Sequence, residues 1–505
     1  MRADDPADQR LLADVHPDDH ENPTPDGRYN LVVIGAGTAG LICAAGSAGL
    51  GAKVALIERQ HLGGDCLNVG CVPSKALLRA AHAASDAARA GELGVHVDGA
   101  IRVDFAEVMR RMREVRARIS PNDSVDRYTN ELGVDVYLGE ARFTGDDTVE
   151  VGGQTLRFAK AVIATGARPA LPSIPGLAQA EPLTNENVFD LVEQPEHLLV
   201  IGGGPIGCEL AQAFRRLGSR VTIVERASQF LVREDPDAAQ VLYASLQRDG
   251  VDVRLETEVA RIERDGGQHR AVLARDGQEE KLVFDRVLVA LGRLPNVAGL
   301  GLEDIGVEFD ARRGVHVDDE LRTTNPKIFA AGDVCMAWKF THAADHAARI
   351  VIQNALFSIG PFGQRKLSKL NMPWCTYTEP EIAHVGLYAH EAEARGIAVD
   401  TWVQPLADVD RAIAEGRDEG FVKIHTKKGK GEILGATIVA ENAGDLISEI
   451  SVAMAGRVSL GTLANVIHPY PTQADAIRAA AAQHVKTRLT PGVKRLFERF
   501  LAWRR

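Results

Sequence analysis

Residues 63–75 read Gly63-Gly-Asp-Cys66-Leu-Asn-Val-Gly-Cys71-Val-Pro-Ser-Lys75. It places two cysteines five positions apart in a chain that has only six cysteines among 505 residues. One helical turn can bring two such Cα atoms within the roughly 4.4–6.8 Å that a disulfide requires. The pattern predicts a redox-active disulfide. A pair of buried thiols and half of a metal site are the alternatives, although zinc usually takes four ligands at close spacing and the other cysteines are scattered singly.

A dinucleotide-binding pattern lies just upstream of this stretch. An apolar run over residues 29–34 suits a buried parallel strand and leads into Gly35-Ala-Gly37-Thr-Ala-Gly40 and a helix of small residues. Glycines permit a tight turn and close backbone approach, while the helix N-terminus offers free N–H groups to a pyrophosphate. The next strand ends at Glu58, 21 positions after Gly37, where a carboxylate can bind ribose hydroxyls.

The same order of elements recurs later in the chain. An apolar strand over residues 197–201 precedes Gly202-Gly-Gly204-Pro-Ile-Gly207 and a helix, and a strand over 220–224 ends at Glu225. One such glycine motif is a weak signal, but two in the same context predict two dinucleotide sites. Further apolar strands are expected to end at Gly166, Gly292 and Gly332.

Composition excludes several classes of function. A chain with 45% hydrophobic and 25% charged residues is typical of a globular protein, and a net charge of −11 argues against nucleic acid as a main partner. No apolar run is long enough to span a membrane, and no basic segment followed by an apolar stretch marks a secretory signal. An isolated close cysteine pair is typical of a reducing compartment, so we expect a cytoplasmic enzyme that acts on small molecules.

Other segments differ in character. Residues 1–27 are rich in aspartate and proline and predict a disordered acidic leader, and residues 105–130 predict one long polar-faced helix. From residue 369 the pattern changes to half-exposed strands and helices, which predicts a separate α+β domain. Residues 486–505 interleave basic and apolar side chains. This tail suits either an anionic membrane surface or, as the favoured interpretation, a helix packed against the protein.

The ordered set of motifs resembles the flavoprotein disulfide reductases, which include dihydrolipoamide dehydrogenase, glutathione reductase and mercuric reductase. The motifs are the two glycine patterns, the Cys66 to Lys75 segment, Ala164-Thr165-Gly166, Gly292-Arg293-Leu-Pro-Asn296 and Ala331-Gly332-Asp333. Three segments are most similar in sequence to the mercuric reductase-like branch: the residues around the two cysteines, Lys339-Phe-Thr-His-Ala-Ala-Asp345 and Tyr470-Pro-Thr472.

The resemblance implies an α/β fold with two Rossmann-like dinucleotide-binding domains, one for FAD and one for NAD(P), and a C-terminal α+β dimerisation domain. The expected boundaries are 28–180 and 301–368 for FAD, 181–300 for NAD(P) and 369–485 for dimerisation. A homodimer is implied, in which the C-terminal domain completes the active site of the partner. In such an enzyme a hydride from the nicotinamide reaches FAD and then, as an electron pair, the disulfide.

The resemblance also assigns roles to single residues. Cys71 would be the thiolate beside the flavin, Cys66 the interchange thiol that meets substrate, and Lys75 would lie near the flavin and pair with Glu209. A solvated surface charge is the alternative for Lys75 and for Glu209. The cofactor-binding residues would be Gly35, Gly37, Gly40, Glu58, Gly64, Lys75, Thr165, Gly166, Gly202, Gly204, Gly207, Glu225, Gly292, Arg293, Gly332 and Asp333, of which Glu58 and Asp333 would hold FAD.

The chain departs from most of this family at the active-site base. Where most members carry a His and, five residues later, a Glu, the aligned residues here are Tyr470 and Asp475. A phenol with an ordinary pKa of about 10 is a poor base near neutrality, which argues against efficient thiol–disulfide turnover. Mercuric reductases are similar in placing a Tyr there. His468 is a possible substitute base, but on a regular strand it would share a face with Tyr470, and a structural role for His468 is the favoured alternative.

The chain lacks cysteines that the mercuric reductase interpretation would lead one to expect. Mercuric reductases usually carry a vicinal cysteine pair at the C-terminus, and many carry an N-terminal Cys-x-x-Cys metal-binding domain. No cysteine follows Cys375 and residues 1–27 contain none, so Hg(II) is expected to reach Cys66 and Cys71 directly, and any mercuric activity is expected to be weak or to use other thiols. Glu225 would repel a 2′-phosphate and favours NADH, whereas Arg226 and Arg233 would accommodate NADPH. The leading hypothesis is an NAD(P)H-dependent flavoenzyme that reduces a metal ion or a disulfide. An FAD enzyme that uses oxygen, quinone or another nicotinamide nucleotide and a redox sensor are the alternatives.

Overall fold

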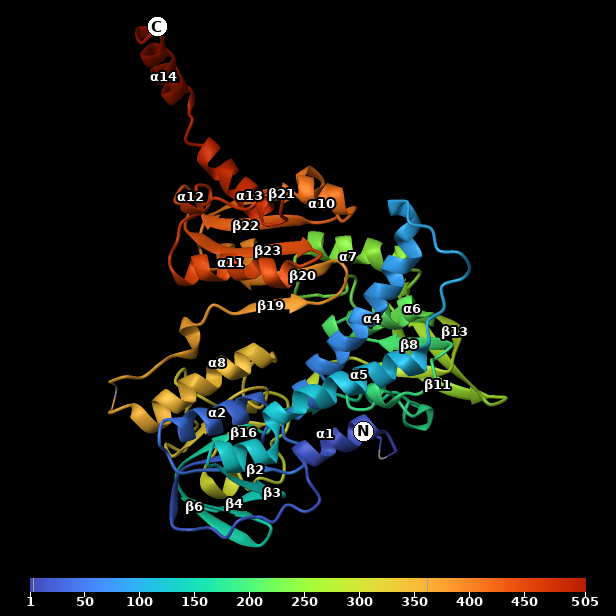
Figure 1. The fold of residues 1–505 in the computed structure, drawn as a ribbon, viewed down its shortest axis with the longest axis vertical. Coiled ribbons are helices and arrows are strands. Elements are labelled where there is room, and N and C mark those ends of the chain that lie inside the picture. The colour runs from blue at the N-terminus through green and yellow to red at the C-terminus, as the bar shows by residue number, and fades with distance from the viewer. Residues whose placement is uncertain (3, 361) are drawn as a thin grey trace. The chain divides into compact units, whose positions relative to one another are not determined.

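The computed structural model describes residues 1–2, 4–360 and 362–505. The chain divides into two compact units. The first comprises Met1–Arg226 and Arg254–Leu370, and the second comprises Ala227–Val253 and Asn371–Arg505. Figure 1 shows the elements of both units along the chain.

The first unit is built on a seven-stranded sheet. Strand β1 (Arg28–Ile34) lies between β2 (Val54–Glu58) and β6 (Gln154–Ile163), and all three are parallel. Strand β3 (Asp135–Leu138) extends the sheet beyond β2, and β18 (Ile328–Ala330) pairs with β6. The antiparallel strands β5 (Thr148–Val151) and β4 (Ala141–Gly145) follow β6 at the opposite edge. The central strands are buried on both faces, which explains their continuous apolar sequence.

A second parallel sheet in the same unit repeats the arrangement. Strands β9 (Arg220–Val224), β8 (His197–Ile201) and β14 (Arg286–Val289) are parallel neighbours, and α6 (Pro205–Leu217) connects β8 to β9. The two predicted strands at 197–201 and 220–224 are confirmed to the residue. An antiparallel sheet of β11 (Glu258–Asp265), β12 (Gln268–Arg275) and β13 (Gln278–Phe284) follows.

The second unit is an antiparallel five-stranded sheet with helices, as the predicted α+β domain requires. The strands are β19 (Pro373–Thr376), β20 (Glu381–Gly386), β23 (Ile433–Ala440), β22 (Phe421–Lys427) and β21 (Val399–Pro405), in that order across the sheet. Helices α11 (Ala443–Ala455) and α13 (Asp475–Lys486) contribute apolar side chains to its core.

Residues 227–253, including helix α7 (Pro236–Arg248), belong to the second unit, although the sequence assigned them to the nucleotide domain at 181–300. Buried polar contacts explain this grouping. The Glu234 carboxylate accepts hydrogen bonds from Trp374 Nε1 at 2.7 Å and from the Tyr388 hydroxyl at 2.8 Å. Lys423 Nζ lies 2.8 Å from the Asp235 carboxylate.

The prediction of disorder for residues 1–27 is wrong, because helix α1 (Pro6–Val15) forms there. Asp5 caps it by accepting a hydrogen bond from the Ala7 N–H at 2.9 Å. The Asp8 carboxylate and the Arg116 guanidinium form an ion pair at 2.5 Å in which both side chains are fully buried. Composition showed the acidic residues of the leader but not their arginine partner on α5 (Phe105–Ile119).

Three further predictions are corrected. The helix expected over 105–130 ends at Ile119 and continues as 3₁₀ and π turns, with Pro121 just beyond its end. Residues around His468 and Tyr470 form a loop rather than a strand. The tail forms helix α14 (Pro491–Trp503), but none of its residues is buried, so the expected packing is wrong. Among the described residues, no helix combines the length and apolar character that crossing a membrane requires.

Candidate redox active site

The two cysteines of the redox stretch lie on different helices. Cys66 is in the middle of the short helix α3 (Gly64–Asn68), and Cys71 is the first residue of α4 (Cys71–Arg89). The break at Gly70 replaces the single helical turn that the spacing suggested. A Cβ on Gly70 would lie 2.7 Å from the Asp65 carbonyl oxygen, so the tight link between the helices requires glycine. Both cysteines are thiols in this structure.

The two thiols differ in acidity. A hydrogen bond from the Cys66 thiol is the main cause that lowers the pKa of Cys71 to about 6, and the Thr341 hydroxyl and Lys75 add to the effect. The same hydrogen bond raises the pKa of Cys66, and burial raises it further. Cys71 also lies at the N-terminus of α4, where the helix dipole favours a thiolate. Near neutral pH the pair therefore holds one thiolate, Cys71, and one thiol, Cys66.

Two elements distant in sequence complete this site. Thr341, the first residue of α8 (Thr341–Ile352), places its hydroxyl 3.3 Å from Cys71 Sγ. Lys75 Nζ donates to Glu209 Oε2 on α6 at 2.8 Å, and the Glu209 side chain is almost fully buried. Lys75 and Glu209 therefore form the pair that the resemblance implied, which excludes independent solvated charges.

A buried polar network supports the loop between the cysteines. Arg116 donates to the Asn68 carbonyl oxygen at 2.6 Å and to the Asp8 carboxylate at 2.5 Å. The Asn68 side-chain amide donates to the carbonyl oxygens of Leu62 at 2.9 Å and Gly64 at 2.8 Å. The fully buried guanidinium of Arg116 on α5 thus joins α1 to the segment between Cys66 and Cys71.

The first glycine motif forms a cradle that a side chain would fill. Gly35 has a φ of +100°, and a Cβ there would lie 2.4 Å from the Ala164 carbonyl oxygen. A Cβ on Gly40 would lie 1.7 Å from the Gly35 carbonyl oxygen, and one on Gly64 would lie 2.6 Å from the Gly37 Cα. Such close backbone approach at the start of α2 (Thr38–Gly49) fits the pyrophosphate of FAD.

Glu58 ends β2 beside this cradle, and burial raises the pKa of its carboxyl. Its two oxygens accept backbone hydrogen bonds from Ala36 at 2.6 Å and from Gln60 at 2.8 Å. The carboxylate therefore fixes the glycine turn from the position where a ribose would lie. This geometry fits the role in FAD binding that the resemblance implies.

The remaining predicted FAD-side residues lie at loops of the same unit. Thr165 donates its hydroxyl proton to the Asn296 carbonyl oxygen at 2.7 Å, which joins the Gly166 turn to the Gly292 loop. Arg293 pairs with Asp65 and lies 3.3 Å from the Asp333 carboxylate. Burial raises the pKa of Asp333. Gly332 has a φ of +82°, and a Cβ there would meet the Ala39 Cβ at 3.3 Å.

The second glycine motif repeats the first in detail. Gly202 has a φ of +108°, a Cβ on Gly207 would lie 2.1 Å from the Gly202 carbonyl oxygen, and Gly204 caps α6. The Glu225 carboxylate accepts the Gly203 N–H at 2.8 Å, as Glu58 accepts Ala36. This repeated geometry fits a second dinucleotide.

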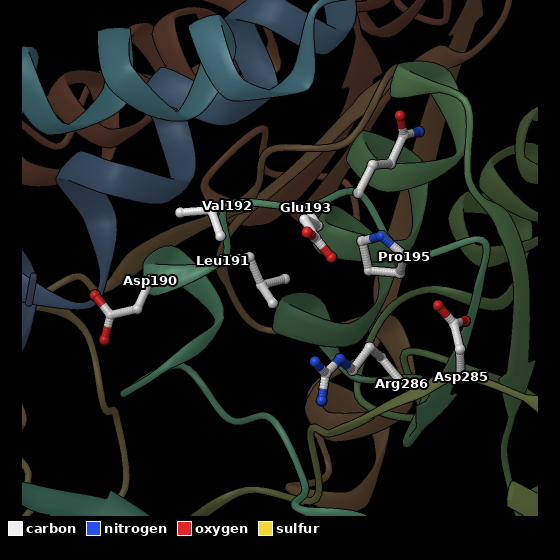
Figure 2. Close-up of a pocket in the computed structure, with 8 residues that line it drawn as sticks. Asp190, Leu191, Val192, Glu193, Pro195, Asp285 and Arg286 are labelled. Carbon is white, nitrogen blue, oxygen red and sulfur yellow. The ribbon is translucent and has the colours of Figure 1, made fainter. Parts of the chain in front are cut away.

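A separate cavity of about 400 Å³ is lined by Asp190 to Pro195, Asp285 and Arg286 (Figure 2). Asp190 to Pro195 precede β8, Asp285 precedes β14 and Arg286 is the first residue of β14, so the cavity lies at the amino ends of the parallel strands. Nucleotides bind at the carboxyl ends of such strands, where Gly202 lies. The cavity is therefore distinct from the second glycine cradle.

The residues predicted as the base lie in the second unit. Tyr470 is 75% exposed and donates its hydroxyl proton to Asp410 at 2.7 Å, and this hydrogen bond raises its pKa. Asp475 pairs with Arg478 at 2.7 Å rather than with Tyr470. His468 lies 2.9 Å from Glu449. Tyr470 and Asp475 therefore do not reproduce a base and its carboxylate partner.

The other cysteines are separate from the redox pair. Cys43 and Cys208 are fully buried, as expected for packing thiols on the two glycine-motif helices. Burial raises the pKa of Cys43 and of Cys335 to about 12, and the Cys335 thiol donates to the Gly332 carbonyl oxygen at 3.6 Å. None of these three thiols is poised to ionise near neutrality.

Sequence reasoning missed several residues that the structure brings to these sites. Arg116, Asp8 and Asp410 had no motif to mark them, because each acts through a contact with a residue far away in the sequence. Asn68 and Thr341 lie inside quoted motifs, but nothing in the sequence showed what their side chains contact. The similarity of Lys339-Phe-Thr-His to the mercuric reductase-like branch was the only sequence signal for Thr341.

Comparisons with known proteins agree with this geometry. Residues 29–348 match the family described as pyridine nucleotide-disulphide oxidoreductase, and residues 372–481 match its dimerisation domain. The mercuric reductase of Staphylococcus aureus is 35% identical over 456 residues, which cover 90% of this chain and 82% of that enzyme. The dihydrolipoyl dehydrogenase of Chlamydia muridarum is 33% identical over 468 residues, which cover 91% of this chain and 98% of that enzyme.

A solved structure is similar over the same range. The HOCl-induced flavoprotein disulfide reductase RclA from Escherichia coli matches with a TM-score of 0.79 and 29% identity over 90% of this chain and 99% of its own. Binding of FAD and of a pyridine nucleotide is typical of these proteins. The family matches cover most of the chain, and the cysteine pair and both glycine cradles agree with them. The chain belongs to the pyridine nucleotide-disulphide oxidoreductases, a family of flavoprotein enzymes.

Proposed function

We propose that this enzyme uses a reduced nicotinamide nucleotide to reduce a thiophilic metal ion at Cys66 and Cys71, with Hg(II) as the first substrate to test. Bound FAD would supply two-electron transfer between the nucleotide and the cysteine pair. The residues that would hold FAD are the Gly35 to Gly40 turn, Glu58 and Asp333. The overall reaction is balanced, because one NADH and one Hg(II) give NAD⁺, one proton and Hg(0).

The observation that carries this proposal is the state of Tyr470. Its exposed phenol donates to Asp410, and this hydrogen bond raises its pKa above the ordinary value, so even less of it is in the deprotonated form that could take a thiol proton near neutral pH. Thiol–disulfide exchange at Cys66 needs a group that takes and returns the thiol proton. A metal ion has no such need, because binding itself displaces protons from thiols.

The cysteine pair suits a soft metal ion. Cys71 offers a thiolate near neutral pH, and Cys66 can follow when the metal displaces its proton. A Cu(II) complex of the related RclA, at 28% identity and a TM-score of 0.80, supports metal ions as a class of acceptor. The mercuric reductase relatives support Hg(II) in particular.

Two finer features belong to the same proposal. The match to the dimerisation domain supports a homodimer whose Tyr470 and Asp475 lie beside the cysteines of the partner. Glu225, held at the end of β9 by the Gly203 N–H, supports NADH over NADPH because a fixed carboxylate would repel a 2′-phosphate.

The test is anaerobic NADH oxidation by the FAD-loaded enzyme with Hg(II) in excess small thiol. Turnover that depends on metal and disappears in Cys66→Ser and Cys71→Ser supports the proposal. Cys375→Ser is the matched control, because Cys375 is half-buried, as Cys66 is, but is not one of the redox pair. Faster turnover with lipoamide or oxidised glutathione than with Hg(II) would instead assign a disulfide substrate; the dihydrolipoyl dehydrogenase relatives act, by their name, on the dithiol form of lipoyl.

A further inference from the structure

Helix α14 is well formed but exposed along most of its length. The Thr490 side chain accepts a hydrogen bond from the Val493 N–H at 3.3 Å, and Pro491 occupies the first helical position. None of its residues is buried, and it extends away from α13 in the second unit (Figure 1). Trp503 is 80% exposed and Leu496 is 63% exposed. An exposed run of large apolar side chains normally marks a surface that binds something.

The helix has two clearly different faces. At 3.6 residues per turn, the apolar side chains fall within about 160° of the circumference. They are Val493, Leu496, Phe497, Phe500, Leu501 and Trp503. The opposite face carries Lys494, Arg495, Glu498 and Arg499, and Arg504 and Arg505 follow the end of the helix. The stripe is wide and rich in aromatic residues, and only one acidic residue interrupts the basic face.

Charge separates this segment from the rest of the protein. Seven basic residues and one acid give residues 486–505 a charge of +6, whereas the whole chain carries −11. Within the part of the chain that the structure describes, no ion pair involves Lys494, Arg495 or Arg499. The helix is about 20 Å long at 1.5 Å per residue, which exceeds the roughly 8 Å over which salt screens charge. Arg499, in the third turn, therefore lies beyond this screening length from the start of the helix, measured along its axis.

The position of the basic residues favours lipid over protein as the occupant. Lys494 lies next to Leu501 at one margin of the apolar stripe, and Arg499 lies next to Trp503 at the other, on the helical wheel. Long basic side chains at the margins reach phosphate headgroups while the apolar face enters the acyl boundary. The Arg504 guanidinium also lies 5.7 Å from the centre of the Phe500 ring. A protein partner would need two rows of acids that flank one apolar groove.

We propose that α14 is an interfacial anchor that lies flat on an anionic lipid surface and recruits this enzyme to it. Burial of the apolar stripe and attraction of the basic face to lipid phosphates act together. Each basic residue near such a surface strengthens binding about fivefold. The inference is independent of the acceptor proposed above, because α14 contains none of the redox residues.

The test is binding of the FAD-loaded enzyme to vesicles of phosphatidylglycerol and phosphatidylcholine, followed by co-sedimentation and by Trp503 emission. Vesicles of phosphatidylcholine alone are the neutral control. Leu496→Ser with Phe500→Ser should weaken vesicle binding at least about tenfold, since each replacement removes an apolar side chain that would be buried in the lipid. Arg495→Gln with Arg499→Gln should weaken binding to the anionic vesicles about 25-fold and leave the neutral ones unchanged.

Leu93→Ser is the matched control, because Leu93 is 71% exposed and lies outside α14. It should bind vesicles as the wild type does. Absence of binding to anionic vesicles, or equal binding by the Leu496 and Phe500 variant, would overturn the proposal.

A change of oligomeric mass in that variant, without vesicle binding by the wild type, would assign the stripe to a second copy of the chain. NADH oxidation in solution should be unchanged in every variant, so failure here is distinct from failure of the proposed acceptor.

Discussion

The buried ion pair between Asp8 and Arg116 gives the sharpest prediction about the leader. Both side chains are fully buried, and Arg116 also donates to the Asn68 carbonyl oxygen between the two cysteines. Asp8→Asn removes the negative partner and leaves a buried guanidinium without a counter-charge. Loss of one partner of a buried pair costs about 3–5 kcal/mol. Hydrogen exchange in α1 should therefore accelerate by roughly two to nearly four orders of magnitude, since 1.36 kcal/mol is tenfold.

Hydrogen exchange followed by mass spectrometry on peptides that cover α1 measures this directly. Asp4→Asn is the matched control, because the Asp4 carboxylate pairs with Arg2 at 2.7 Å on the exposed surface. An exposed pair contributes about 0–1 kcal/mol, so that variant should change exchange by less than tenfold. Equal exchange in the two variants would refute the argument that the leader is held by a buried charge. Arg116→Met combined with Asp8→Asn should recover part of the protection, since no unpaired charge remains.

Three more predictions follow from the sites. Thr341→Val should raise the pKa of Cys71 above about 6, so alkylation of the reduced enzyme by iodoacetamide will need higher pH; in the wild type the rate should fall tenfold per pH unit below about 6 as the thiolate is protonated. Asp410→Asn should lower the pKa of Tyr470 toward about 10 in a tyrosine NMR titration, and an unchanged value would remove the hydrogen bond as the cause. Glu225→Ala should decrease kcat/KM for NADH more than for NADPH, and an unaltered ratio in steady-state kinetics would show that this carboxylate does not select the nucleotide.

Local patterns in the sequence were sufficient for the parallel strands and the glycine turns. Residues 197–201 and 220–224 were predicted to the residue because a strand buried on both faces is a largely apolar run, which Gly202 ends in the first case and Glu225 in the second. The cysteine pair could also be predicted from a local pattern, because the motif from Cys66 to Lys75 is only ten residues long. In contrast, the order of α1 depends on Arg116, more than 100 positions away from Asp8, and composition alone suggested disorder.

The active-site surroundings were harder to predict than the motifs. Lys75 and Glu209 are 134 positions apart, and only the resemblance joined them. The Tyr470 hydroxyl binds Asp410, whereas the sequence alignment suggested Asp475 as its partner. Spacing along the chain predicts contacts within one element, but a loop side chain takes whichever partner the tertiary fold brings near.

The two strand-end glutamates show how one residue can hold the protein and still bind a ligand. Glu58 accepts the Ala36 and Gln60 N–H groups, one on each carboxylate oxygen. An ionised carboxylate has about four acceptor positions, so two remain for the hydroxyls of a ribose. Glu225 makes the equivalent bond to Gly203 in the second motif. The carboxylate thus fixes the glycine turn before the nucleotide arrives, and replacement of either glutamate should loosen the turn and weaken ribose binding together.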